Sequence, residues 1–320
     1  MLWRKTEYSE RWHIIVGRYL IVGGSGLVGQ ALVKRLIARG DQVAIGTRSP
    51  YRANLKDERM IRLPLDAGAW DKAVEDKPFD GVVNLAGHSI SSGRWTSEVK
   101  NAILQSRIST TNLIVDWIEK APVRPRVLVN ASAVGFYGPS ETEVFTEDSQ
   151  PHEQDFLGTV AGAWENAAGR ATAIGVRVVT ARLGIVLASD GGALPRLIIP
   201  YRMRVGGTIG SGRQWVSWVH VSDAARLFEF ALDQTELNGP VNVTSPMPVT
   251  MRDLGKAVAA ELGTHSSFPV PGLIIKAVLG EAGSLILTGQ KVIPSKAVSA
   301  GFSFQFPSIQ GALHDLLSNR

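Results

Sequence analysis

The chain has 320 residues, 44% of them hydrophobic, and its 34 basic and 29 acidic residues give a formal net charge of +5. This length and composition predict a large α/β domain with an attached lobe and a complete hydrophobic core. The charges are interspersed without a basic tract, which favours a soluble protein with a small anionic ligand and argues against a nucleic-acid binder.

The first 17 residues precede the first expected strand and are interpreted as an N-terminal extension. They mix charged and aromatic residues and lack the uninterrupted apolar core of a secretion signal. A frayed extension or an upstream start codon is favoured, and a targeting role is the alternative.

A strand, a glycine turn and a helix follow, and they carry the strongest signal in the chain. Residues 19–22 are apolar or aromatic, glycines follow at positions 23, 26 and 29, and an amphipathic helix over residues 31–39 ends at Gly40. Such a turn lets the backbone approach a pyrophosphate, and the N–H groups and positive dipole end of the helix hold the anion. The predicted cofactor-binding residues here are Gly23, Ser25, Gly26, Leu27, Val28 and Gly29.

Strands and helices alternate after this turn, which predicts a Rossmann-type, doubly wound parallel sheet with ligands at its carboxyl edge. Strands are expected at residues 42–47, 60–63, 79–85, 126–131 and 176–183, and helices at residues 95–120 and 156–173. This dinucleotide-binding core is assigned to residues 18–184.

Residues 185–320 are assigned to a smaller, mixed substrate lobe with a C-terminal helical extension, some segments of which return to the core. Helices are expected from about 191–195 to 204, at 221–233, and up to 262 after a Thr250 cap. A strand is expected at 241–244, and short helices from about 270 to 317.

Several classes of site are excluded or not expected. The sequence has no cysteine, which rules out disulfides, cysteine nucleophiles and thiolate metal sites. Its six histidines lack H-x-x-x-H spacing, so no metal is expected. The most apolar late stretch, 273–287, contains Lys276 and Glu281, so no membrane span is expected. A cytoplasmic protein is predicted.

The end of the second strand indicates which nicotinamide cofactor is preferred. NAD binders usually place an acid there, whereas this chain has Thr47-Arg48-Ser49, and a guanidinium can bind a 2′-phosphate. NADP(H) is therefore predicted over NAD(H), the alternative being a solvated arginine before Pro50. Asp66 either accepts a hydrogen bond from the adenine amino group or caps a helix over residues 67–74.

The glycine spacing and a second motif resemble the short-chain dehydrogenase/reductase superfamily, especially its extended, epimerase-like branch. The spacing is G-x-x-G-x-x-G, and the fourth strand ends in Asn84-Leu85-Ala86-Gly87, similar to the superfamily's N-x-A-G pattern. The resemblance implies that the backbone of Leu85, Ala86 and Gly87 lies against the ribose and the nicotinamide linkage.

The resemblance also implies a serine or threonine after the fifth strand and a Tyr-x-x-x-Lys pair on the next helix. Residues 130–138 are similar to the family's S-S-x-x-V-Y-G stretch, with Ser132 in place of the serine. Leu157 and Ala161 fall where the pair is expected, and no Tyr-x-x-x-Lys occurs in the chain. Ser132 is the first candidate catalytic residue. Tyr137 would supply the missing phenol if its loop folds inward, and otherwise it is a packing residue.

Residues 210–223 resemble a segment of nucleotide-sugar epimerases, but Val216 falls where an arginine would bind the sugar-nucleotide diphosphate. A nucleotide-diphosphate sugar is therefore not the expected substrate. Arg107, on the long helix, is interpreted as a salt-bridge partner. The predicted substrate-pocket residues, with solvated loops and core packing as their alternatives, are Ser89, Arg94, Arg213, Trp215 and Trp218.

Several separated motifs agree in order with one subgroup, namely residues 191–195, 210–220, 289–294 and 300–302. They resemble the atypical epimerase-like family sometimes labelled as cell-division inhibitors, with its C-terminal extension. The resemblance implies an NADP(H)-dependent oxidoreductase or epimerase-like protein acting on a small carbonyl or hydroxyl substrate. A non-catalytic NADP(H) sensor is the alternative, and a homodimer or an unknown protein partner is left open.

Overall fold

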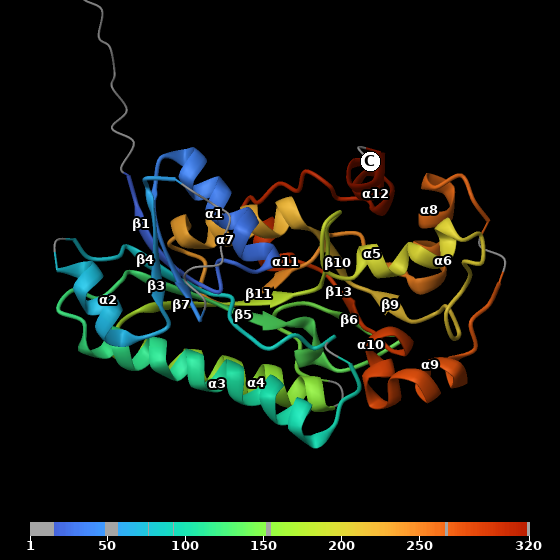
Figure 1. The fold of residues 1–320 in the computed structure, drawn as a ribbon, viewed down its shortest axis with the longest axis horizontal. Helices are drawn as coiled ribbons and strands as arrows, with labels where there is room; N and C mark the ends of the chain where they lie inside the picture. Colours follow the sequence, from blue (N-terminus) through green and yellow to red (C-terminus); the bar gives the residue numbers. More distant parts are fainter. Residues whose placement is uncertain are drawn as a thin grey trace, which may run out of the picture.

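A seven-stranded parallel sheet forms the centre of the computed structural model, which describes residues 16–48, 57–75, 77–91, 93–151, 155–265 and 268–318 (Figure 1). Every neighbouring pair in the sheet is parallel. Most of the predicted N-terminal extension, residues 1–15, lies outside the described residues. In spatial order the strands are β11 (Gly239–Val243), β7 (Arg177–Leu183), β5 (Val127–Ala133), β4 (Gly81–Asn84), β1 (Arg18–Val22), β2 (Gln42–Thr47) and β3 (Met60–Pro64).

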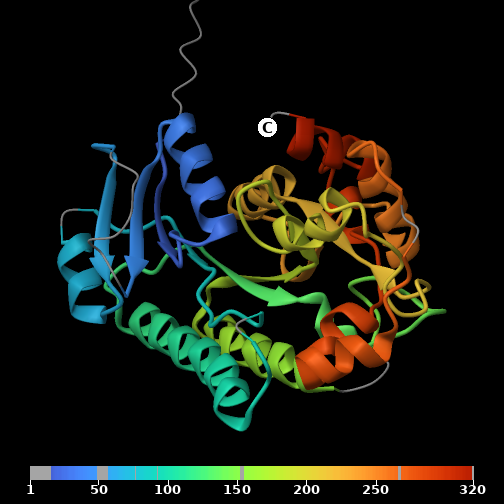
Figure 2. The ribbon, with the colours of Figure 1, turned by 45° about the vertical axis from the view of Figure 1, so that its right-hand side comes forward.

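Helices cover both faces of the sheet, as a parallel sheet requires (Figure 2). Side chains alternate along β1, so that Tyr19 and Ile21 join one core cluster while Leu20 and Val22 join the other. The predicted Rossmann-type fold is confirmed. One face carries α1 (Leu27–Arg39) and α7 (Val221–Asp233), and the other carries α2 (Ala67–Val74), α3 (Ser97–Lys120) and α4 (Phe156–Gly169).

Most of the segments after β7, apart from β11 and α7, build a second lobe around its own core, which includes Leu194, Trp218, Leu254 and Leu313. The helix expected up to residue 204 is two short ones, because Pro200 has no N–H to continue the first. The lobe's elements are β8 (Ile185–Leu187), α5 (Leu194–Leu197), α6 (Ile199–Arg202), β9 (Trp215–Val216), β10 (Trp218–His220), β12 (Val249–Thr250), α8 (Met251–Glu261), α9 (Gly272–Leu279), α10 (Ser284–Leu287), β13 (Lys291–Val292) and α12 (Ile309–Ser318). In contrast, α11 (Ser295–Ser299) returns to the central sheet, where it packs on β11 and Ala297 joins the first core cluster.

Two short elements link the lobe to the sheet. A 3₁₀ turn, η1 (Val134–Tyr137), follows β5, and β6 (Val144–Phe145) pairs with β13 of the tail. Over the described ranges, no helix has the length and apolar character needed to cross a membrane. In the same part of the chain, no three histidine or acidic side chains gather into a possible metal site.

Candidate functional site

The turn between β1 and α1 is closed so tightly that two of its positions require glycine. Gly23 has a φ of +82°, and a Cβ there would lie 2.8 Å from the backbone nitrogen of Ala86. A Cβ on Gly29 would lie 2.5 Å from the carbonyl oxygen of Gly23. The turn is thus packed against the end of β4 on one side and against its own helix on the other.

The N-terminus of α1 is open to an anionic group. Its N-cap is Gly26, no side chain caps the helix, and its first turn contains no acid. The free N–H groups of the first turn, which begins with Leu27 and Val28, therefore retain their affinity for negative charge. Ser25 and Gly26 are exposed, and a Cβ on Gly191 would lie 3.0 Å from the Leu27 side chain. The loop after β8 thus reaches the edge of this site.

Two further predicted cofactor-binding residues follow β2 and β3 at the same edge of the sheet. Arg48 follows β2 and is exposed. Asp66 accepts a hydrogen bond from the Ala69 N–H at 3.0 Å and is the N-cap of α2, so the helix-cap interpretation of this residue is confirmed.

A buried polar network holds the turn at the end of β4. Asn84 Nδ2 donates to Thr111 Oγ1 at 2.9 Å and to Asn130 Oδ1 at 2.7 Å, while Asn84 Oδ1 accepts from the Ala86 N–H at 3.1 Å. Trp164 Nε1 donates to the same Thr111 hydroxyl at 3.0 Å. Leu85 and Ala86 are therefore fixed beside the glycine turn. Sequence reasoning did not identify Thr111 as part of this network, and the one feature that could have indicated it is a polar residue on the apolar face of α3.

Ser132 lies at the end of β5 and is buried. Its hydroxyl donates to Glu165 Oε1 at 2.6 Å. Arg182 holds the same carboxylate through Nε and Nη2, both at 2.8 Å. This paired, bidentate geometry is the strong form of an ion pair. Sequence reasoning missed Glu165 and Arg182 as site residues because they come from different elements and meet only in the fold.

Tyr137 has the surroundings of a packing residue, which is one of its two sequence-based interpretations. It is fully buried in η1, its hydroxyl donates to Asn242 Oδ1 at 2.8 Å, and it accepts from Arg182 Nη1 at 3.0 Å. Burial raises the pKa of this phenol. The phenol is enclosed in the core with its hydroxyl bonded to Asn242 and Arg182, which favours the packing interpretation of Tyr137 over the catalytic one.

Comparison with known proteins identifies the family of the chain. Residues 19–244 match the NAD dependent epimerase/dehydratase family. The chain belongs to this family. Residues 270–316 match a second family model, which is described as a domain of unknown function (DUF1731). This match confirms the C-terminal extension expected from the sequence.

Family relatives align over nearly the whole chain. Epimerase family protein YfhF of Bacillus subtilis is 39% identical over 300 residues, covering 94% of this chain and 98% of the relative. A chloroplastic SDR39U1 homologue of Arabidopsis thaliana is 40% identical over 303 residues, which cover 93% of this chain and 86% of the relative. The crystal structure of human SDR39U1, isoform 2, with NADPH is 33% identical, covers 95% of this chain and 100% of that one, and has a TM-score of 0.83.

The predicted substrate residues of this family member contact several different segments. Ser89 and Arg94 lie in the loop after β4, and Arg94 donates to the carbonyl oxygens of Ala277 and Val278 at the end of α9. Arg213 and Trp215 both contact Glu141 of another loop. Trp218 is fully buried and donates to the carbonyl oxygen of Met247, as its core-packing alternative expects, and the substrate-pocket assignments stay predictions.

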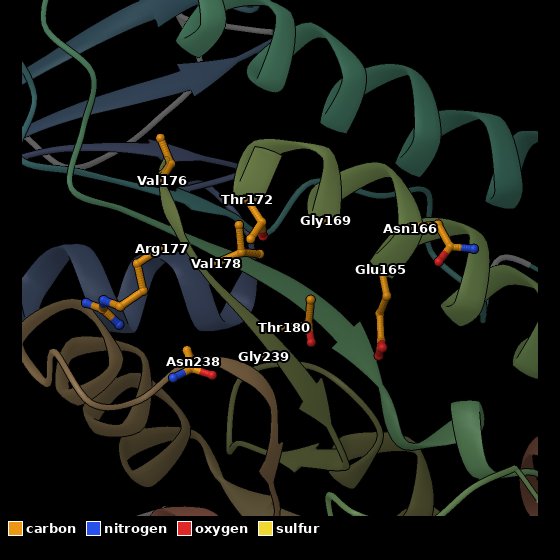
Figure 3. Close-up of a pocket in the computed structure, with 10 residues that line it drawn as sticks. All are labelled: Glu165, Asn166, Gly169, Thr172, Val176, Arg177, Val178, Thr180, Asn238 and Gly239. Carbon is orange, nitrogen blue, oxygen red and sulfur yellow. The ribbon is translucent and has the colours of Figure 1, made fainter. Parts of the chain in front are cut away.

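A hollow of about 460 Å³ lies beside α4 and is lined by the first half of β7 and the start of β11 (Figure 3). In Figure 3 Glu165 extends from α4 towards the strands, while Arg177 turns away from it to donate to backbone carbonyls at the end of α7. Doubly wound folds such as this family's bind ligands at the carboxyl ends of strands. The hollow lies towards the amino ends, away from the glycine turn, and it touches the Ser132 site only through its lining residue Glu165.

Proposed function

We propose that the chain binds NADP(H) along the carboxyl edge of the sheet and transfers hydride to or from a small carbonyl or hydroxyl substrate. The observation that carries the proposal is the uncapped N-terminus of α1, which the Gly23 turn holds against Leu85 and Ala86. Amide groups at such an N-terminus suit a pyrophosphate. The NADPH in the human relative's structure supports the same assignment.

Arg48 supports the choice of NADP(H) over NAD(H). It follows β2, where the family's NAD-binding members are expected to carry an acid for the ribose 2′-hydroxyl. Its guanidinium is exposed and available to a 2′-phosphate.

We expect Arg48→Glu to lower NADPH affinity by about tenfold or more, because a charge-assisted hydrogen bond is replaced by charge repulsion. NADH affinity should stay the same or rise. Fluorescence titration with each nucleotide measures the change, and Arg124→Gln, at an exposed arginine beyond the end of α3, is the control. Equal NADPH affinity in the variant and wild type would refute the assignment of Arg48.

The chemistry is assigned to Ser132. When bound, the nicotinamide ring supplies or accepts the hydride. In the oxidative direction, the proton of the substrate hydroxyl passes to the Ser132 oxygen as the Ser132 proton passes to the Glu165 carboxylate, 2.6 Å away, while the hydride leaves the substrate carbon. In the reductive direction the protons move the opposite way, so that Ser132 protonates the substrate oxygen and receives a proton from Glu165. Arg182 keeps Glu165 in place in both directions.

Ser132→Ala should reduce substrate-dependent NADPH turnover by about 10²–10⁴-fold, the usual contribution of a positioned acid or base. NADPH affinity should be unchanged, because the hydroxyl is assigned to the substrate. Ser222→Ala, which removes a hydroxyl bonded to Gln305 in the other lobe, is the matched control. Full turnover in Ser132→Ala would remove Ser132 from the mechanism.

A non-catalytic sensor is the second candidate, and one observation favours it. Leu157 and Ala161 share a face of α4 with Glu165 at successive spacings of four, and they stand where the family resemblance implies tyrosine and lysine. A sensor would bind NADPH without turnover and change its oligomeric state with the redox state of the nucleotide. A carbonyl-metabolite screen followed by NADPH absorbance separates the two candidates. The substrate, any partner and the cytoplasmic location stay predictions.

A further inference from the structure

Arg107 is a cation without a counter-ion at the carboxyl edge of the sheet. The sequence predicts a salt bridge for it, yet in the part of the chain that the structure describes no carboxylate pairs with it. Burial lowers its pKa to about 10, which leaves the guanidinium charged at neutral pH. A partly buried charge without an ionic partner costs free energy, which a bound anion would recover.

The guanidinium of Arg107 is held in one orientation. Nη1 donates to the carbonyl oxygens of His88, at 3.1 Å, and Ile103, at 2.8 Å. Its Cζ lies 4.9 Å from the centre of the Trp164 ring and 3.0 Å from where a Cβ on Gly87 would stand. Gly87 therefore lies directly beside the guanidinium, at the end of β4.

The other two nitrogens of Arg107 point to a ligand. Nε and Nη2 make no hydrogen bond to any residue that the structure describes, and neither is among its buried polar atoms without a partner. Both therefore reach solvent. This Nε–Nη2 edge is the fork that binds two oxygens of a carboxylate or phosphate side by side.

Two more arginines lie around the same loop. Arg196, on α5, donates to the carbonyl oxygen of Ser91 at 3.3 Å, and Arg94 donates to the end of α9. Within the described ranges neither forms an ion pair, whereas the nearby Lys100 is neutralised by Glu281 at 2.7 Å. The loop after β4 thus lies near two further guanidinium groups that no carboxylate neutralises, and this positive charge favours anions at the site.

We propose that Arg107 binds the oxyanion of the substrate, a carboxylate or a phosphate ester, through its Nε–Nη2 edge. The proposal rests on the function proposed above and names the substrate class of the same site. The substrate is then a small anionic carbonyl or hydroxyl compound, with its charged end at Arg107 and its reacting carbon towards Ser132.

The test measures oxalate and inorganic phosphate binding to the NADPH-loaded full chain by calorimetry, for wild type, Arg107→Gln, Arg107→Lys and the exposed control Arg124→Gln. Wild type and the control should bind at least one of the two anions. Arg107→Gln should weaken that binding by about tenfold or more, and Arg107→Lys should weaken it less, because the charge remains but the fork is lost. The anion that binds tells carboxylate from phosphate.

NADPH affinity and melting temperature are measured for each variant, which separates the two proposals. Failure of wild type to bind NADPH refutes the proposed function. Normal NADPH binding with no anion bound, or with equal anion affinity in a folded Arg107→Gln, overturns the Arg107 proposal alone. A loss of NADPH affinity in Arg107→Gln with unchanged anion affinity also overturns it, because the guanidinium then serves the cofactor.

Discussion

Arg182→Met is expected to lower the free energy of unfolding by about 3–5 kcal/mol, the cost of breaking a buried ion pair by removing one partner. The Arg182 side chain is 4% exposed and that of Glu165 is 13% exposed. The substitution leaves the Glu165 carboxylate buried without its cation and removes a donor to Tyr137. In the wild type the guanidinium of Arg182 also stacks on Phe136, with its Cζ 3.5 Å from the centre of the ring. Urea unfolding followed by circular dichroism measures the change.

The double variant Arg182→Met with Glu165→Leu is the control for this prediction. Replacing both charges by apolar side chains should cost less than the sum of the single changes, because no charge is left unpaired. If the free energy of unfolding of Arg182→Met lies within about 1 kcal/mol of the wild-type value, water already screens the Arg182–Glu165 ion pair. Such a result would also weaken the role of Arg182 in holding Glu165 for Ser132.

Gly29→Ala is expected to reduce NADPH affinity by roughly 100-fold, which corresponds to about 2.7 kcal/mol. The new Cβ would stand 2.5 Å from the Gly23 carbonyl and 2.7 Å from the Gly24 Cα. Since all these atoms belong to the backbone, the turn must move away from α1, and the N–H groups that would hold the pyrophosphate move with it. Fluorescence titration with NADPH measures the loss.

Gly162→Ala is the matched control, because a Cβ at this helical position of α4 meets no atom within 4 Å. It should leave NADPH affinity unchanged and raise stability by up to about 1 kcal/mol through helix propensity. If Gly29→Ala binds NADPH as tightly as Gly162→Ala does, the close packing at the glycine turn is irrelevant to binding.

The positions of most strands and helices in the sheet domain were predictable, because the sequence patterns that indicate them are local. Apolar runs and helical periodicity place the parallel strands, and the strand at residues 42–47 and the helix at 221–233 have the predicted ends. The start of α1 was missed by four residues. The packing of the glycine turn overrides the low helix propensity of Gly29, so the helix begins at Leu27.

The polar contacts of the site were less predictable, because they depend on side-chain directions after β5 and on contacts between distant elements. Nothing local distinguishes a Tyr137 that reaches a substrate from one that turns into the core. The pairing of Glu165 with Arg182 joins α4 to β7. The absence of an ionic partner for Arg107 also depends on the tertiary structure. The sequence of a helix indicates which side chains lie three or four residues apart on its surface, but it does not show which loop packs beside it.

The most direct measurement is a titration of the purified full chain into NADPH and into NADH, followed by nucleotide fluorescence and by the melting temperature. We expect saturable binding of one NADPH per chain, with a higher melting temperature and a weaker response to NADH. No change in either signal with both nucleotides would contradict it, because the amide-lined opening beside Gly23 would then hold no dinucleotide.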